Sequence, residues 1–237
     1  MYQLKNKLLN ALSREAKDRI FPLLKLVKMP LGAVIYEVSE KLDYVYFPID
    51  SIVSLLYVLE DGASAEISVI GNEGIVGIAV FMGGESTPNR AVVQSDGSAY
   101  RLPAEELRTE FNSQPDIRRL LLRFTQSLIA QMAQTAVCNR HHSIDQQLCR
   151  WLLLSIDRLP SNDLTMTQEL IANMLGVRRE GVTEAAGKLQ KLGVITYKRG
   201  HISVIDRQRL EVESCECYQV VKSETARLEL YMQNGIG

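Results

Sequence analysis

Residues 167–194 read TQELIANMLGVRREGVTEAAGKLQKLGV, and this stretch decides the fold that we expect for the whole chain. Apolar residues at helical spacing predict two short helices, one over Thr167–Leu175 and one from about Arg178 to Lys191. Gly176 between them can leave the first helix with a positive φ angle. Two helices of these lengths around a glycine turn are typical of a helix-turn-helix, whose second helix can enter the major groove of DNA.

The next residues, 193–205, read GVITYKRGHISVI and alternate between apolar and polar side chains on both sides of a KRGH turn. This pattern predicts a β-hairpin, or wing, with its cations at the tip, where they can reach phosphate. The simpler interpretation is a helical hairpin with a solvated charged face. The wing and the pair Arg179 and Glu180 favour DNA binding, because arginine can bind guanine and glutamate can accept from the cytosine amino group.

The pattern T-Q-E-x-x-A-x-x-L-G-V-x-R-E-x-V followed by a wing resembles the winged helix of the cyclic-AMP receptor/fumarate–nitrate regulator (Crp/Fnr) superfamily of bacterial transcription factors. The resemblance implies a homodimer that reads a near-palindromic DNA site with the helix Arg178–Lys191, and RNA polymerase as a further partner. Three positions depart from the family pattern. Arg178 replaces a phosphate-contacting serine, Gly181 removes a hydroxyl, and Glu184 stands where many members carry a base-reading arginine, so the familiar half-site is not expected.

The DNA contacts that we expect fall into two groups. Arg179 and Glu180 are predicted to read bases, with weaker expectations for Thr183 and Glu184. Contacts to phosphate position a protein on DNA without specifying sequence. The residues predicted to make them are Thr167, Gln168, Arg178, Lys188, Lys198, Arg199 and His201.

The composition is that of an ordinary globular protein, with 237 residues, 46% apolar and 23% charged residues, and a net charge of −1. Charge is uneven, because residues 165–205 hold six Lys or Arg and three Glu, a net charge of +3. Such a local basic patch is the electrostatic footprint of a nucleic-acid binder. The sequence has no run of eighteen apolar residues and no signal-peptide pattern, so we expect no membrane partner. Four cysteines do not form a disulfide framework for this length, which favours the cytoplasm.

Residues 25–102 consist of short β-branched and aromatic runs separated by turn residues, and about eight such strands predict a small β-barrel or jelly roll. In the resembled superfamily this is the effector-sensing β-roll. We therefore expect an α+β fold with an N-terminal jelly-roll β-barrel like a cyclic-nucleotide-binding domain, a long dimerisation helix and a C-terminal winged helix-turn-helix. The predicted divisions are residues 1–112, 113–140 and 141–237, the last with a C-terminal helical extension.

The segment 71–91 stands where the resembled superfamily carries its phosphate-binding cassette, a Gly-Glu-Leu followed by Arg-Ser or Arg-Thr. Here Gly74 lacks the following glutamate, and Arg90 is followed by Ala91. Glu73 could substitute with an offset of one residue, which makes Glu73, Gly74 and Arg90 the candidate effector pocket. The alternative for Arg90 is an ordinary strand-edge arginine. We expect the effector, if there is one, to be an unknown small molecule other than cyclic AMP.

Residues 116–139 predict one continuous helix with a single apolar seam at spacings of three and four residues. The seam residues are Ile117, Leu121, Phe124, Leu128 and Met132. A seam this long after a β domain favours pairing with the same helix of a second copy, as the resemblance also implies. The alternative is a helix that lies along its own β-roll.

The remaining chemistry-bearing residues give no catalytic or cofactor site. Cys215 and Cys217 form a C-x-C pair that lacks the third and fourth ligands of a zinc site, so two buried thiols and no metal are expected. His141 and His142 are adjacent and would point apart on a helix. No recognisable nucleophile, base and orienting group occur together, so we expect neither an enzyme nor a cofactor.

Two other function classes stay open. One is a cyclic-nucleotide-responsive regulator, and the other is a ligand-binding β-roll protein whose helical domain binds a protein instead of DNA. The salt dependence of binding distinguishes this protein-binding class from a DNA-binding protein, because DNA binding weakens steeply with ionic strength and protein docking need not.

Overall fold

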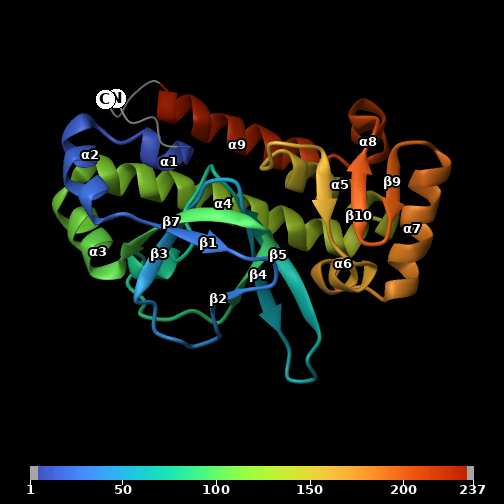
Figure 1. The fold of residues 1–237 in the computed structure, drawn as a ribbon, viewed down its shortest axis with the longest axis horizontal. Coiled ribbons are helices and arrows are strands. Elements are labelled where there is room, and N and C mark those ends of the chain that lie inside the picture. Colours follow the sequence, from blue (N-terminus) through green and yellow to red (C-terminus); the bar gives the residue numbers. More distant parts are fainter. Residues whose placement is uncertain (1–4, 234–237) are drawn as a thin grey trace.

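A computed structural model describes residues 5–233, so the outermost residues of the first and last predicted divisions lie outside it. Two bodies lie side by side, a β-rich one and a helical one with a small sheet, and the long helix α4 runs behind the first into the second (Figure 1). The chain enters through α1 (Lys7–Asn10) and α2 (Arg14–Ile20), which Asn6 and Ser13 cap. A short 3₁₀ turn, η1 (Phe21–Leu23), leads into the strands.

Residues 25–103 form the β-roll, as predicted, with seven strands rather than about eight. Its three-stranded sheet has the order β1-β7-β3 and its four-stranded sheet the order β2-β6-β4-β5, with antiparallel neighbours throughout. The strands are β1 (Lys25–Met29), β2 (Val34–Tyr36), β3 (Tyr44–Pro48), β4 (Ile52–Val58), β5 (Ser64–Ile70), β6 (Arg90–Ser95) and β7 (Gly97–Pro103). Between β5 and β6 the chain forms loops and the 3₁₀ turn η2 (Ile78–Val80).

Two helices follow, α3 (Ala104–Ser113) and α4 (Pro115–His141), and Pro115 starts α4 where a missing N–H is harmless. The helix α4 packs on the β-roll at close range. A Cβ atom added to Gly74 would overlap the ring of Phe124, so only glycine allows this contact.

The predicted dimer seam is wrong, because α4 turns it into the core of its own chain. The side chains of Ile117, Leu121, Phe124 and Leu128 are at most 3% exposed, and Met132 packs beside them. Helical periodicity identifies a buried face without showing what buries it, and here the β-roll does.

The C-terminal body, residues 144–204, is a winged helix. Its first helix α5 (Ile144–Ile156) begins with a capping box between Ser143 and Gln146. The helices α6 (Gln168–Leu175) and α7 (Arg179–Lys191) follow the quoted sequence within one residue of the expected bounds. The strands β8 (Asp163–Thr165), β9 (Ile195–Lys198) and β10 (His201–Val204) form one antiparallel sheet with β10 in the centre.

The last two described helices are α8 (Arg207–Glu213) and α9 (Cys217–Gln233), which form the predicted C-terminal helical extension with a break at residues 214–216. The helix α9 runs back along α4 toward the N-terminal body (Figure 1). Its Tyr218 and Val221 belong to the winged-helix core, whereas Leu228 belongs to the β-roll core. The helix α9 therefore packs on both sides of the predicted domain boundary near residue 141, and it ties the two bodies together.

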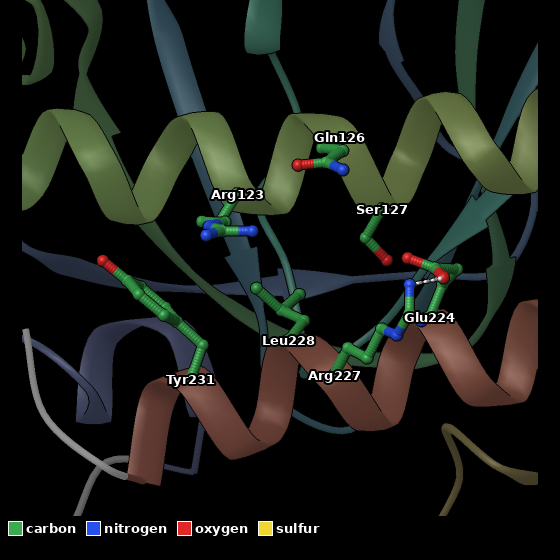
Figure 2. A pocket seen from close by; sticks show the side chains of 7 residues that line it. All are labelled: Arg123, Gln126, Ser127, Glu224, Arg227, Leu228 and Tyr231. Carbon is green, nitrogen blue, oxygen red and sulfur yellow. Dashed lines mark hydrogen bonds and ion pairs between the residues drawn. The ribbon is translucent and has the colours of Figure 1, made fainter.

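The contact between α4 and α9 is incomplete. A hollow of about 350 Å³ remains between the two helices, with polar side chains along much of its wall (Figure 2). Its lining is Arg123, Gln126, Ser127, Glu224, Arg227, Leu228 and Tyr231.

Across the described residues, no helix is long and apolar enough to span a membrane.

A buried ion pair joins the two bodies. Arg158, just after α5, places its Nε 2.7 Å from Glu73 Oε1, and both side chains are less than 10% exposed. Glu73 also accepts from the backbone N–H of Gly71, and Arg158 Nη1 donates to the carbonyl of Leu154 at 2.7 Å. Burial makes such a pair sensitive to the loss of one partner, because the remaining charge stays uncompensated.

We expect Glu73→Ala to lower the free energy of unfolding by about 3–5 kcal/mol, as for other broken buried pairs. The matched control is Glu37→Ala, which removes the exposed partner of Arg90 and should cost less than about 1 kcal/mol. Urea denaturation of the two variants measures both values. Equal losses would contradict the structural weight given to the buried pair.

A second buried group, Glu66, sits in a hydrogen-bonded chain that reaches α5. Ser54 Oγ lies 2.6 Å from Glu66 Oε2 and 2.9 Å from Gln94 Oε1, and Gln94 Nε2 donates to Ser155. One hydroxyl proton cannot serve both acceptors of Ser54. A protonated Glu66 that donates to Ser54 satisfies the chain, and burial raises the pKa of Glu66 to about 7 despite the opposing hydrogen bond from Ser54 and the charges of Arg150 and Arg158.

The raised pKa predicts a pH-dependent stability. In the unfolded chain Glu66 has a pKa near 4.5. Its contribution to the free energy of unfolding is therefore fully present below that pH and is lost as the pH rises through about 7. The loss amounts to about 3 kcal/mol. Glu66→Gln keeps the donor to Ser54 and should flatten the stability profile between pH 5 and 7, measured by urea denaturation at each pH. An unchanged slope would show that another group carries it.

Candidate DNA-binding site

The helix-turn-helix is built by local signals. Thr167 caps α6, with its side chain accepting from the backbone N–H of Leu170 at 3.2 Å. Gly176 ends α6 with φ of 66°, as the sequence predicts. An added Cβ at Gly176 would lie 3.2 Å from Ala65 Cβ, so the turn abuts the β4–β5 hairpin of the β-roll.

The helix α7 presents its N-terminal half to solvent. Its inner stripe, which consists of Val182, Ala185, Ala186 and Leu189, is buried in the winged-helix core. An added Cβ at Gly181 would lie 2.7 Å from the terminal Cδ1 of Ile144 in α5, so the end of that side chain would have to shift. The outward face carries Glu180 and Glu184, both exposed.

The wing is the predicted hairpin. Lys198 pairs with His201, and the two residues between them, Arg199 and Gly200, both have positive φ, 53° and 81°. That conformation is the type I′ turn that suits a two-residue hairpin loop. Tyr197 Oη donates to the carbonyl of Met166 at 2.8 Å, which holds the wing against the start of α6.

A hollow of about 420 Å³ lies where α6, α7 and the wing meet, and we call it the cationic hollow. Arg179 and Arg199 bring two positive charges to it from segments twenty residues apart, against the single acid Glu169. Its lining is Thr167, Gln168, Glu169, Arg179, Tyr197, Arg199 and Gly200. Four residues predicted to contact DNA therefore share one concave surface.

Sequence reasoning missed Tyr197 as part of this surface. Burial raises the pKa of its phenol, so the group stays a neutral hydrogen-bond donor. The alternating wing pattern identified its strand without showing which face of that strand meets α6.

The other residues predicted to contact DNA lie outside the lining of the cationic hollow. Of the eleven predicted residues, Gln168 is half-buried and the rest are exposed. The hydroxyl of Thr183 donates to Gln168 Oε1 at 2.8 Å, so the two hold each other. His201 Nδ1 lies 3.2 Å from the hydroxyl of Thr165.

Lys188 lies on the flank of α7 that faces α5. Its Nζ is 3.0 Å from Asp145 Oδ2 and 3.1 Å from Glu184 Oε1. The hydrogen bond to Asp145, followed by that to Glu184, raises the pKa of Lys188. Two acids already compensate this charge, which leaves less of it for a phosphate than at Arg199.

The three candidate effector residues do not form one pocket, so that prediction is wrong. Glu73 pairs with Arg158, and Gly74 packs on Phe124. Arg90 Nη2 lies 2.6 Å from Glu37 Oε1 at the surface, as expected of a strand-edge arginine. The offset of one residue turns Glu73 toward α5 instead of toward the inside of the β-roll.

A different cavity, of about 310 Å³, lies between the β-roll and Met132 of α4. Its lining has no charged side chain, and Tyr36 Oη donates to Asn89 Oδ1 at 3.0 Å within it. The lining residues are Tyr36, Leu42, Leu55, Ile70, Gly77, Ile78, Ala79, Met82, Gly84, Ser86, Thr87, Pro88, Asn89 and Met132.

Comparisons with known proteins match both bodies. The family model described as a cyclic nucleotide-binding domain matches residues 26–114, and the one described as a Crp-like helix-turn-helix domain matches residues 146–213. The global nitrogen regulator of Synechococcus elongatus is 22% identical over 192 residues, which cover 77% of this chain and 86% of that protein.

Two solved structures share the fold. A Crp/Fnr-family transcriptional regulator from Eubacterium rectale superimposes with a TM-score of 0.69 at 19% identity, covering 87% of this chain and 96% of the other. FixK2 from Bradyrhizobium japonicum superimposes with a TM-score of 0.67 at 19% identity, covering 81% of this chain and 98% of the other.

A β-roll of the cyclic nucleotide-binding type, a long helix and a winged helix with an exposed cationic hollow define a DNA-binding transcription regulator with a cyclic nucleotide-binding-like domain. The chain belongs to the Crp/Fnr superfamily of bacterial transcription regulators.

Arg199→Asn tests the wing without disturbing its turn, because Asn-Gly is the preferred sequence for a type I′ hairpin. Loss of one phosphate contact should weaken binding to all DNA sequences and lower the slope of log affinity against log salt by about 1. The control, Lys28→Thr on β1 of the β-roll, removes an exposed cation far from this site. Fluorescence anisotropy over a salt series measures both slopes. Equal slopes in the variant and the control would exclude the wing contact.

Proposed function

We propose that this protein is a homodimeric regulator that inserts the start of α7 into the major groove of a near-palindromic DNA site. The observation that supports it most is the cationic hollow, where Arg179 of α7, Arg199 of the wing and the capped start of α6 meet on one exposed face. Half-sites in this arrangement lie one helical turn, about 34 Å, apart. We assign the protein no catalytic step.

Within this proposal, Arg179 and Glu180 read base edges, because they stand at the exposed N-terminal end of α7. Thr183 and Glu184 are weaker readers. Arg199 and the start of α6 hold the phosphates on either side of the groove, and exposed residues around the cationic hollow add further phosphate contacts. The residues in this positioning group are Thr167, Gln168, Arg178, Lys198, Arg199 and His201.

We place the dimer contact on a different face of α4 from the one that the sequence suggested. Leu122 and Ile129 are 44% and 56% exposed, and Ala136 continues the row at the same interval of seven residues. Exposed Ala133 lies between the last two. An interval of seven with small or apolar side chains is the pattern that pairs helices in a coiled coil.

We further propose that the cavity beside Met132 receives any effector. Its lining has no cation to compensate a cyclic phosphate, which supports an uncharged small molecule. A cyclic-nucleotide-responsive regulator is the alternative, and calorimetry with cyclic AMP and cyclic GMP decides between them. RNA polymerase as a partner and the cytoplasm as location stay predictions.

The experiment that tests the function is selection of bound DNA from a random pool without added ligand, followed by the same selection at higher salt. We expect a near-palindrome whose recovery falls steeply with salt. No enrichment, together with salt-independent docking to a protein, would favour the rival class in which the helical body binds protein.

Arg179→Ala should lose about 1–3 kcal/mol of binding free energy at one base position of the selected site and little on random DNA. Lys198→Ala is the matched control, because a lost phosphate contact weakens binding to all sequences alike. Competition binding on single-base variants of the site gives both values. An equal loss on selected and random DNA for Arg179→Ala would exclude its base-reading role.

Ile129→Glu should convert the dimer to monomers, because a charge on each helix would face its twin across an apolar seam. Val212→Glu on α8 is the control, since its side chain is 80% exposed and lies off α4. Sedimentation equilibrium measures the dissociation constant of each variant. A dimer that survives Ile129→Glu unchanged would place the interface elsewhere.

A further inference from the structure

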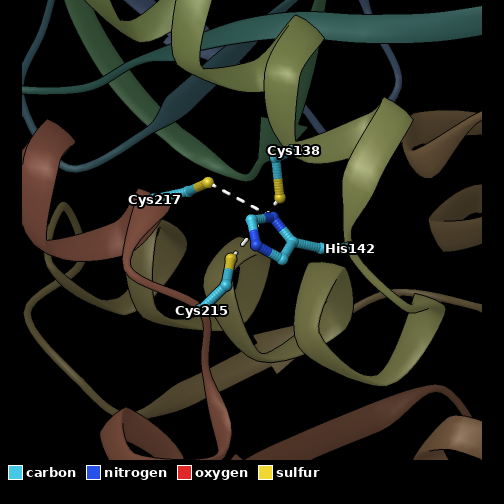
Figure 3. Close-up of side chains that lie close together, drawn as sticks. All are labelled: Cys138, His142, Cys215 and Cys217. Carbon is cyan, nitrogen blue, oxygen red and sulfur yellow. Dashed lines mark hydrogen bonds between the residues drawn. The ribbon is translucent and has the colours of Figure 1, made fainter.

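Four side chains outside the DNA-binding surface converge on one point (Figure 3). Cys138 lies in the last turn of α4 and His142 directly follows that helix. Cys215 and Cys217 lie at the break between α8 and α9. The sequence argument that the C-x-C pair lacks further ligands is therefore wrong, because the fold brings Cys138 and His142 from more than 70 positions away.

The distances fit a single metal ion. Cys138 Sγ and Cys215 Sγ are 3.6 Å apart, Cys217 Sγ and His142 Nδ1 are 3.4 Å apart, and all four ligand atoms lie within 4.8 Å of one another. Tetrahedral zinc, with bonds of about 2.3 Å to sulfur and about 2.0 Å to nitrogen, places sulfurs about 3.8 Å apart and sulfur about 3.5 Å from nitrogen. In an iron–sulfur cluster the protein ligands are divided among two or more irons, which requires a wider set.

The three thiols are shielded from solvent, and the side chain of His142 is 15% exposed. Cys138 and Cys217 are fully buried, and Cys215 is 5% exposed. The three sulfurs form a cluster of their own, apart from the two apolar cores. Four protein ligands with no position left for water are the mark of a structural zinc site.

A second layer of groups orients these ligands. His142 turns Nδ1 to the sulfurs, while its Nε2 lies 3.3 Å from Glu216 Oε2, the residue between the two cysteines. A carboxylate on the outer nitrogen of a metal-binding histidine fixes its tautomer and strengthens it as a ligand. Gln134 Nε2 donates to Cys217 Sγ at 3.0 Å, a bond that favours the thiolate.

The surrounding charge also suits a thiolate site. Arg150 is 4% exposed and donates to Thr135, one turn before Cys138 on α4. Its Nε has no hydrogen-bond partner within the part of the chain that the structure describes. Three thiolates around a divalent ion carry one net negative charge, which would compensate this buried cation.

We propose that Cys138, His142, Cys215 and Cys217 bind one zinc ion. The ion fastens the end of α4 to the α8–α9 break, at the point where α5 leaves α4 for the winged helix. Each thiol binds as a thiolate and releases its proton to solvent. The site stands on its own geometry and does not depend on the proposed DNA contacts.

The test uses the full chain, purified without added metal and assayed by plasma mass spectrometry. We expect one zinc per chain. After removal of the zinc with a chelator under reducing conditions, Co²⁺ should bind with the same stoichiometry and give the visible bands of tetrahedral cobalt and thiolate-to-cobalt charge transfer. X-ray absorption of the zinc form should give three sulfur ligands and one nitrogen.

Variants connect the metal to these residues. Cys215→Ala should abolish binding, whereas Cys149→Ala, which removes a buried cysteine of the winged-helix core, should keep one zinc per chain. Glu216→Gln should weaken zinc affinity by about 10- to 100-fold through His142, with the tetrahedral cobalt spectrum retained. If Cys215→Ala does not fold, the cobalt spectrum of the wild-type protein and the zinc affinity of Glu216→Gln still test the proposed site.

Four outcomes would overturn the proposal. One is a reduced protein that holds no zinc and takes up no cobalt. Another is octahedral cobalt without thiolate charge transfer. The third is a metal-free protein with a disulfide between Cys138 and Cys215, and the fourth is a protein with an iron–sulfur chromophore.

Discussion

The buried ion pair between Glu73 and Arg158 is the contact on which the arrangement of the two bodies depends. It joins the loop after β5 to the end of α5 inside a low-dielectric interface, where an unpaired partner would be strongly unfavourable. The polar chain from Glu66 to Ser155 lies in the same interface, and Gly176 lets α6 approach the β4–β5 hairpin. The orientation of the winged helix, and with it of α7, is thus set by contacts with the β-roll.

The long helix α4 has one face on the β-roll, one on α9 and one that is exposed. Phe124 and the rest of its buried seam face the β-roll, and Ser127 lies on the flank that faces α9. Ile129 lies on the face that remains exposed. The helix α4 is one path from the cavity beside Met132 to the winged helix, in addition to the direct contacts between the β-roll and the winged helix, because α4 also packs on α9 and accepts a hydrogen bond from Arg150 of α5. The cluster of Cys138, His142, Cys215 and Cys217 lies at the end of that path.

Much of the DNA-binding surface could be predicted because its signals are local. The cap at Thr167, the positive φ at Gly176 and the Arg199–Gly200 turn each depend on a few neighbouring residues. The role of Lys188 was harder to predict. Its place on α7 follows from helical spacing, but its pairing with Asp145 depends on how α5 packs against α7.

The sequence by itself determined the order of the elements, the jelly roll and the winged helix, because residue spacing and turn chemistry act over a few positions. Only the tertiary structure decided which partner covers a face or completes a site. It turned the seam of Phe124 inward, paired Glu73 with Arg158 in place of a ligand, and brought Cys138 to Cys215. These contacts join residues 77 or more positions apart, or a helix to one of several possible surfaces, and no local spacing encodes that choice.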